Sequence, residues 1–131
     1  MNASGSREPE RLGIGQHVRH DVGEVEIHEF ACGVPPDLHW FRGHFEGNPV
    51  LPAVVQVHEA FRLVIAVWPD LSRLRRITRA KFQRTIRPSD TLHVRLTRVR
   101  SAERATFEFR RAGETCSSGT LEFASAGTLA L

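Results

Sequence analysis

One histidine-containing loop is the part of this chain best suited to chemistry. The stretch from Trp40 to Gln56 places His44 among two glycines and two prolines and runs directly into an apolar segment. Imidazole has an unperturbed pKa of about 6.5, so it is suited to act as a general base near neutral pH. The start of a helix offers backbone N–H groups that bind negative charge. A base beside such groups points to chemistry at a carbonyl group.

The loop must be held by the element that follows it, which we predict to be a helix over residues 52–68. Pro52 is favourable in the first turn, where its missing N–H costs nothing, and Pro69-Asp70 ends the pattern. At about 100° per residue, one broad apolar face forms, made of Val54, Val57, Phe61, Val64, Ile65 and Trp68. We expect this helix to be buried on most sides. Its polar residues then need partners or water; they are Gln56, His58, Glu59 and Arg62.

About five strands are predicted in the remainder of the chain. The first is expected at residues 22–30, and residues 74–86 are expected to be one long strand, or two joined by a bulge, with Ala80, Phe82 and Ile86 on one face. Further strands are expected over 91–100, 104–110 and 115–123, the last two joined by a hairpin turn at 112–114. Residues 1–15 are expected to be a loose leader, 16–125 a single domain and 126–131 a tail.

These elements predict an α+β fold in which an antiparallel sheet wraps around one long central helix. A single sheet of this kind leaves two edges with unpaired backbone groups. Pairing of two copies covers one edge on each, so we expect a dimer.

Composition and charge narrow the kinds of partner. The chain has 131 residues, of which 40% are hydrophobic and 25% charged, as in an ordinary globular domain. No apolar run approaches the roughly 20 residues of a membrane-spanning helix, and residues 1–11 lack a secretory signal, so we expect a cytoplasmic protein and no membrane partner. The net charge of +3 comes mostly from residues 73–111. The alternation in Leu92–Leu96 is typical of a half-exposed strand and no aromatic residues interleave with the arginines, so we expect no nucleic-acid partner.

Neither the cysteines nor the histidines predict a metal site. Cys32 and Cys116 lie far apart and belong to no CxxC motif, which favours buried free thiols over the alternative of a disulfide. The seven histidines are scattered without the spacing of a structural zinc site, so no metal is expected. His17 and His20 are close enough in sequence to sit together, but we expect them in a flexible leader.

Two segments of the chain resemble the β-hydroxyacyl-acyl-carrier-protein dehydratases. That family's pattern is roughly G-H-F-P-G-x-P-[IV]-x-P-G-V-x-x-x-[ED]-A, and the matching residues are Gly43, His44, Phe45, Gly47, Pro49, Val50, Pro52 and Val54. The segment Lys81–Leu92 resembles the family's K-F-R-x-x-V-x-P-G-D-x-L. Together with the order of elements, the resemblance covers about residues 20–123. The run Leu51-Pro52-x-Val54-x-Gln56 most resembles the subgroup that serves aryl-polyene and related pigment pathways.

The resemblance implies a hotdog fold and dehydration of 3-hydroxyacyl-acyl-carrier-protein thioesters to 2-enoyl thioesters. His44 would remove the proton α to the carbonyl, while a helix carboxylate of the other subunit would handle the leaving hydroxyl. The implied substrate-binding residues are Phe45, Gly47, Pro52, Ala53 and Val54. Acyl carrier protein is the implied partner, and its phosphopantetheine arm arrives with the substrate, so no cofactor is expected. The dimer is expected to be a homodimer or a heterodimer with a related hotdog subunit.

Three positions depart from the family pattern. Glu46 replaces a proline, and Ala53 replaces a glycine, so a methyl group projects where backbone should approach the substrate. His58 stands where the family has its carboxylate, fourteen residues after His44. Glu59 follows it, about 100° further around the helix.

These departures leave three explanations open. A protonated His58 donates to the leaving hydroxyl, in a His/His pair of which one imidazole stays neutral. Alternatively, Glu59 occupies the site through a local shift of the helix start, or the chemistry is lost and the subunit pairs with an active relative. Two structural roles compete: an ion pair between Glu59 and Arg62, and a hydrogen-bonded, buried His58.

The function expected from these residues is therefore that of a dehydratase acting on 3-hydroxyacyl thioesters. One rival is a non-catalytic hotdog partner subunit of a heterodimeric dehydratase. The other is a hotdog acyl thioesterase in which Glu59 activates water. An acidic carrier protein would be steered by a basic surface, for which the candidates are Arg73, Arg75, Arg76, Arg79 and Arg84.

Overall fold

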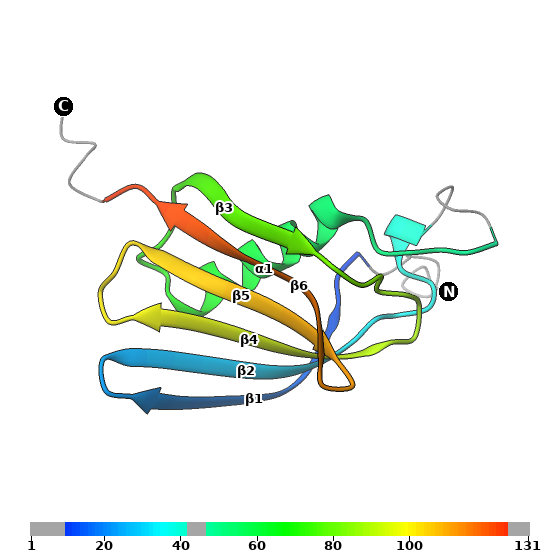
Figure 1. Cartoon of the computed structure of the whole chain (residues 1–131), viewed down its shortest axis with the longest axis horizontal. Coiled ribbons are helices and arrows are strands. Elements are labelled where there is room, and N and C mark those ends of the chain that lie inside the picture. Colours follow the sequence, from blue (N-terminus) through cyan, green and yellow to red (C-terminus); the bar gives the residue numbers. More distant parts are fainter. Residues whose placement is uncertain (1–9, 42–46, 126–131) are drawn as a thin grey trace, which may run out of the picture.

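The computed structural model describes residues 10–41 and 47–125, and the helices and strands named in this subsection lie within those ranges. One antiparallel sheet of six strands runs in the order β1-β2-β4-β5-β6-β3, and the long helix α1 crosses one of its faces (Figure 1). The elements are β1 (Gly13–Val22), β2 (Val25–Gly33), the short 3-10 helix η2 (His39–Phe41), α1 (Ala53–Val67), β3 (Leu74–Phe82), β4 (Thr91–Val99), β5 (Arg104–Arg111) and β6 (Glu114–Phe123). This architecture confirms the α+β prediction.

The sequence predicts about five strands, whereas the described residues form six: the strand expected at residues 22–30 corresponds to β2, and β1 was not predicted. β1 pairs with β2 from Gly13 opposite Gly33 to Val22 opposite Val25, so it begins within the range expected to be the leader. His17 and His20 lie on this strand, and the expectation that they lie in a flexible leader is wrong. Every residue of β1 is exposed, so the strand is held by its backbone ladder and by cross-strand polar pairs. A strand without a buried face leaves no period-two hydrophobic signal in the sequence.

The helix confirms its predicted bounds to within one residue at each end, but the face that it buries is different. Its buried residues are Val55, Gln56, Glu59, Ala60 and Val64. Val54, expected in the core, is 75% exposed, and Phe61 and Ile65 are only partly buried. Much of the most apolar flank of α1 is therefore left open.

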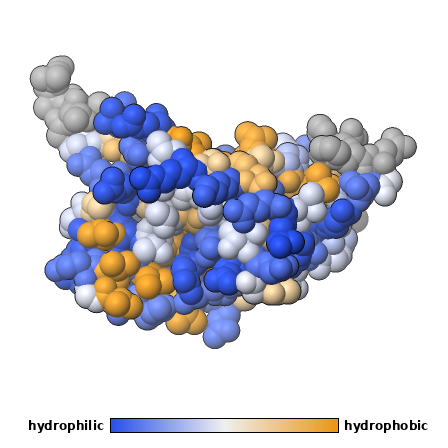
Figure 2. Space-filling view, in the orientation of Figure 1, coloured by the Kyte–Doolittle hydropathy of each residue, from blue (hydrophilic) through white to orange (hydrophobic). Residues whose placement is uncertain are grey.

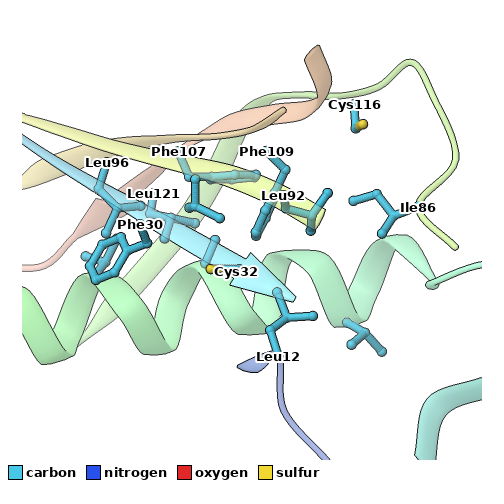
Figure 3. Packing of buried hydrophobic residues seen from close by; sticks show 14 of the residues in the cluster. Leu12, Phe30, Cys32, Ile86, Leu92, Leu96, Phe107, Phe109, Cys116 and Leu121 are labelled. Atoms are coloured by element: carbon cyan, nitrogen blue, oxygen red, sulfur yellow. The ribbon is translucent and has the colours of Figure 1, made fainter. Parts of the chain in front are cut away.

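The core lies between α1 and the inner face of the sheet. Leu92, Val94 and Leu96 of β4 alternate inward, as do Phe107 and Phe109 of β5, whose rings meet at 5.8 Å between centroids (Figure 3). The intervening residues of these strands are charged, histidine or hydroxyl-bearing, and the outward face in Figure 2 is mainly hydrophilic. The half-exposed sheet face expected from Leu92–Leu96 is confirmed.

The strand after the helix is shorter than predicted and contains two irregularities. β3 ends at Phe82, and its register with β6 shifts between Leu74 and Arg76 and again between Thr78 and Lys81. Each extra residue at a bulge reverses the side-chain alternation beyond it. Ile86 is buried beyond the strand, whereas Phe82 is 44% exposed, so the expected common face is wrong.

The two cysteines and the turn between β5 and β6 agree with the predictions made from the sequence. Cys32 and Cys116 are buried free thiols, as predicted, and burial, with the Glu59 carboxylate as a smaller cause, raises the pKa of Cys32 to about 12. The turn between β5 and β6 has positive φ at Ala112 (50°) and Gly113 (80°), as the predicted hairpin requires. None of the helices in the described ranges has the length and apolar character needed to cross a membrane.

Candidate active site

His44 and Phe45, the first two predicted site residues, lie outside the described residues, as do the motif positions Gly43 and Glu46. The described part of the motif starts at Gly47. Its φ of 82° lies in the left-handed region that glycine adopts without steric cost, which explains a glycine at this position.

The motif segment is fixed to the connection between β3 and β4. The Leu51 backbone N–H donates to the Ile86 carbonyl at 2.7 Å, and the Arg87 guanidinium donates to the Asn48 side chain. The two segments that carry the family resemblance, one in the loop and one after β3, therefore meet in space. This contact holds the chain in place where it enters α1.

Gln56 provides a second anchor for the same segment. It is 4% exposed, and its side-chain amide donates to the Leu51 carbonyl at 2.9 Å. From the sequence alone, Gln56 is only a polar helix residue in need of a partner. Gln56 lies outside the apolar face predicted for this helix, so nothing in the sequence signalled its anchoring role.

The first turn of α1 is open to a ligand. Pro52 is the N-cap residue and makes no side-chain capping hydrogen bond, while the N–H groups of Val55 and Gln56 donate to its carbonyl at 3.1 Å. The N–H groups of Ala53 and Val54 precede these two, and both residues are exposed. The first N–H groups of a helix have no intrahelical acceptor, so they can stabilise a developing oxyanion.

His58 and Glu59 lie on different sides of α1. His58 is exposed, one turn after Val54 on the open flank, so the alternative of a buried His58 does not hold in the single chain. Glu59 is 7% exposed, and its Oε1 accepts a hydrogen bond of 2.8 Å from the Leu12 backbone N–H. The partner of this carboxylate is thus the segment before β1 rather than Arg62.

The two side chains also face different spaces. A cavity of about 320 Å³ lies between β1 and α1, lined by Arg11, Leu12, Ile14, Phe30, Glu59, Arg62, Leu63 and Ala66. Its lining is largely apolar, and Glu59 lies at its wall while His58 does not. The geometry therefore separates the two residues that the sequence could not choose between.

A histidine pair lies near the other end of α1. His17 and His28 approach at 2.8 Å between Nε2 and Nδ1, and the buried His28 ring meets the Trp68 ring edge-on. Burial, followed by the nearby His17 and Arg19, lowers the pKa of His28. Among the described residues, no group of three or more histidine, cysteine or acidic side chains is arranged to hold a metal ion.

Comparisons with known proteins agree with the fold and the motifs. A family model described as ApeI dehydratase (ApeI-like) matches residues 19–120. The curated 3-hydroxyacyl-[acyl-carrier-protein] dehydratase FabZ of Latilactobacillus sakei subsp. sakei (strain 23K) is 36% identical over 64 residues, which is 44% of this chain and 46% of the relative. The chain thus matches about half the length of that relative.

Solved structures share the whole fold. An uncharacterized protein from Erwinia carotovora subsp. atroseptica is 27% identical with a TM-score of 0.78, covering 88% of this chain and 98% of that chain. A chain of the dehydratase heterocomplex ApeI:P from Xenorhabdus doucetiae is 24% identical with a TM-score of 0.71, covering 83% and 96%. A putative thioesterase, yhdA from Lactococcus lactis, is 11% identical with a TM-score of 0.57, covering 96% and 99%. The fold is the hotdog fold, and because the family model covers most of the chain, this protein belongs to the ApeI-like dehydratase family.

Proposed function

We propose that this protein dehydrates 3-hydroxyacyl-acyl-carrier-protein thioesters to 2-enoyl thioesters. The observation that carries the proposal is the accessible position of His58 on the open flank of α1, at the point in the motif where the family has its second catalytic group. Membership of a dehydratase family over residues 19–120 supports the reaction class.

In the proposed reaction, His44 takes the proton from the carbon next to the thioester carbonyl. The carbonyl oxygen gains negative charge, which the N–H groups of Ala53 and Val54 stabilise. The absence of a side-chain cap at Pro52 leaves these groups available to the substrate. The bond to the 3-hydroxyl group then breaks, and the double bond forms between the second and third carbon atoms of the acyl chain.

His58 supplies the proton with which the hydroxyl leaves as water. An imidazolium is a competent acid for this step, so histidine can replace the family's carboxylate. Glu59 is not the donor in this proposal, because it is buried and already accepts the Leu12 N–H. No cofactor takes part beyond the phosphopantetheine arm of the carrier protein.

The working unit is a dimer of hotdog subunits. The open flank of α1 includes the exposed Val54 and the partly buried Phe61 and Ile65. Burial of this flank by a partner removes apolar surface from water. It also places His58 in a dry interface, where it can act on substrate bound by the other subunit's loop.

A non-catalytic partner subunit is the second candidate function. It is favoured by the histidine at the carboxylate position, and by the heterocomplex in which the similar Xenorhabdus doucetiae chain occurs. A thioesterase role for Glu59 has less support. That role requires the carboxylate to activate water, whereas in this chain it bonds to a backbone amide.

Product analysis by mass spectrometry separates these functions. The purified protein is mixed with 3-hydroxyacyl and with enoyl thioesters of acyl carrier protein, and the masses of the carrier-bound products are measured. Loss of water from the 3-hydroxyacyl substrate supports the dehydratase, and release of free acid indicates the thioesterase. Turnover only after addition of a related subunit indicates the partner role and contradicts an independent dehydratase.

A further inference from the structure

The two edges of the sheet differ in charge. At the β1 edge, acidic and basic side chains neutralise one another, since Arg19 pairs with Asp21 and Glu26. At the β3 edge, no aspartate or glutamate occurs anywhere between Asp70 and Asp90. The basic residues of that stretch are Arg73, Arg75, Arg76, Arg79, Lys81, Arg84 and Arg87.

The cations at the centre of β3 are largely uncompensated. Arg76 is neutralised by Glu122 of β6 at 2.8 Å. Arg75, Arg79 and Lys81 have no ion-pair partner within the part of the chain that the structure describes, and hydrophilic side chains follow the line of β3 in Figure 2. We call Arg75, Arg79 and Lys81 the cationic edge.

The same strand is an open hydrogen-bonding edge. β3 pairs with β6 alone, so the N–H and C=O groups on its other side have no strand partner in the sheet. Leu74, Ile77 and Phe82 of this strand are 38–44% exposed, and Val54 of α1 is exposed as well. Free backbone groups beside exposed apolar side chains are typical of a surface that another strand covers.

Pairing of two β3 strands from identical chains opposes like charges. The midpoint of the strand is Thr78, and an antiparallel pair related by a two-fold axis there sets Arg75 opposite Lys81. An axis at Ile77 sets Arg75 opposite Arg79. An axis at Arg79 sets Arg79 opposite its own copy. Like charges directly opposite one another destabilise a strand pair.

We propose that the cationic edge selects, as its partner, a hotdog-like subunit whose own edge strand carries aspartate or glutamate, in preference to a second copy of this chain. This inference rests on the dimer of the proposed function and specifies its partner. Opposite charges across the new strand pair stabilise it and speed the encounter.

A charge-reversed copy of the protein serves as the test partner. Arg75→Glu/Arg79→Glu gives the same backbone an acidic edge. Arg100→Glu/Arg110→Glu changes the net charge equally, in the β4–β5 turn and on β5, away from β3. Sedimentation at about 50 mM salt measures each protein alone and each mixed with wild type. We expect the wild type and the β3 variant to form a mixed dimer roughly tenfold tighter than the wild-type homodimer, and we expect no such gain with the control variant.

Wild-type protein alone gives a second measurement that needs no variant. Because salt screens repulsion between exposed charges, self-association of the wild type should rise between about 20 mM and 500 mM salt. A tight wild-type homodimer that is insensitive to salt would overturn the inference. So would a mixture with the β3 variant that binds no better than the mixture with the control.

The carrier protein is the competing ligand for the same cations. If Arg75→Glu/Arg79→Glu abolishes carrier binding and gives no mixed dimer, the surface belongs to the carrier and the inference is wrong. Dehydration is assayed separately on the same samples. A tight wild-type homodimer that removes water from its substrate contradicts the partner inference and leaves the proposed function intact. A mixed dimer that forms as expected but removes no water supports the partner inference and contradicts the proposed function.

Discussion

The carboxylate of Glu59 lies 2.8 Å from the backbone nitrogen of Leu12, 47 positions earlier in the chain. This buried hydrogen bond fastens the start of β1 to the middle of α1. It also turns Glu59 away from the flank on which His58 lies. Two adjacent residues that the sequence offered as alternatives for one catalytic role thus have different environments.

Replacement of Glu59 should reduce stability according to whether the Leu12 N–H keeps an acceptor. Glu59→Ala leaves a buried donor unpaired and should cost about 1–3 kcal/mol of unfolding free energy. Glu59→Gln retains an acceptor oxygen and should cost less than about 1 kcal/mol. Urea titration measures both, and equal losses in the two variants would show that the hydrogen bond is unimportant.

Replacement of His58 should affect the rate rather than the stability. His58→Ala should slow dehydration by about 100-fold or more, the usual contribution of a general acid. Its unfolding free energy should stay within about 0.5 kcal/mol of wild type, because the residue lies outside the core. His58→Glu, which restores the family carboxylate, should be faster than His58→Ala. Full activity of His58→Ala would exclude the residue as the acid.

A charge on the open flank of α1 should weaken the dimer without unfolding the subunit. Val54 is 75% exposed in the single chain, so Val54→Glu should change its unfolding free energy by no more than about 0.5 kcal/mol. The dimer dissociation constant should rise at least tenfold, since about 1.4 kcal/mol of apolar burial is lost. Val22→Glu, at a β1 position that is 62% exposed, is the matched control and should leave the dissociation constant unchanged.

Acid should destabilise the protein partly through His28. Burial lowers the pKa of His28 in the folded state below its ordinary value of 6.5, so the unfolded state takes up a proton first as the pH falls. The stability that depends on neutral His28 is therefore complete above about pH 6.5 and decreases below it. His28→Phe removes this titration, and its melting temperature should fall less steeply than that of wild type between about pH 7 and pH 5.5. Parallel curves for the two proteins would rule out this contribution.

Most of the fold could be predicted because its central strands bury one face. The alternation of Leu92, Val94 and Leu96, and the helix stop at Pro69, are signals of this kind. β1 gave no such signal because its residues are all exposed. The orientation of α1 was only partly predicted: Val64 and Trp68 of the predicted apolar face are buried, whereas Val54 faces outward.

The candidate site could be predicted only as far as local sequence defines it. Pro52 at the helix start and the family motif are encoded within a few residues. The contacts of Glu59 with Leu12 and of Leu51 with Ile86 join positions far apart in the chain, so no local sequence pattern predicts them. The choice between His58 and Glu59 depended on these long-range contacts.

The most direct test of the account is the turnover of a 3-hydroxyacyl-acyl-carrier-protein thioester by wild type and by His44→Ala, with the carrier-bound product weighed by mass spectrometry. Wild type should produce the enoyl thioester with loss of one water. His44→Ala should produce none while its unfolding free energy stays within about 1 kcal/mol of wild type. Undiminished water loss by His44→Ala would contradict the assignment of His44 as the base.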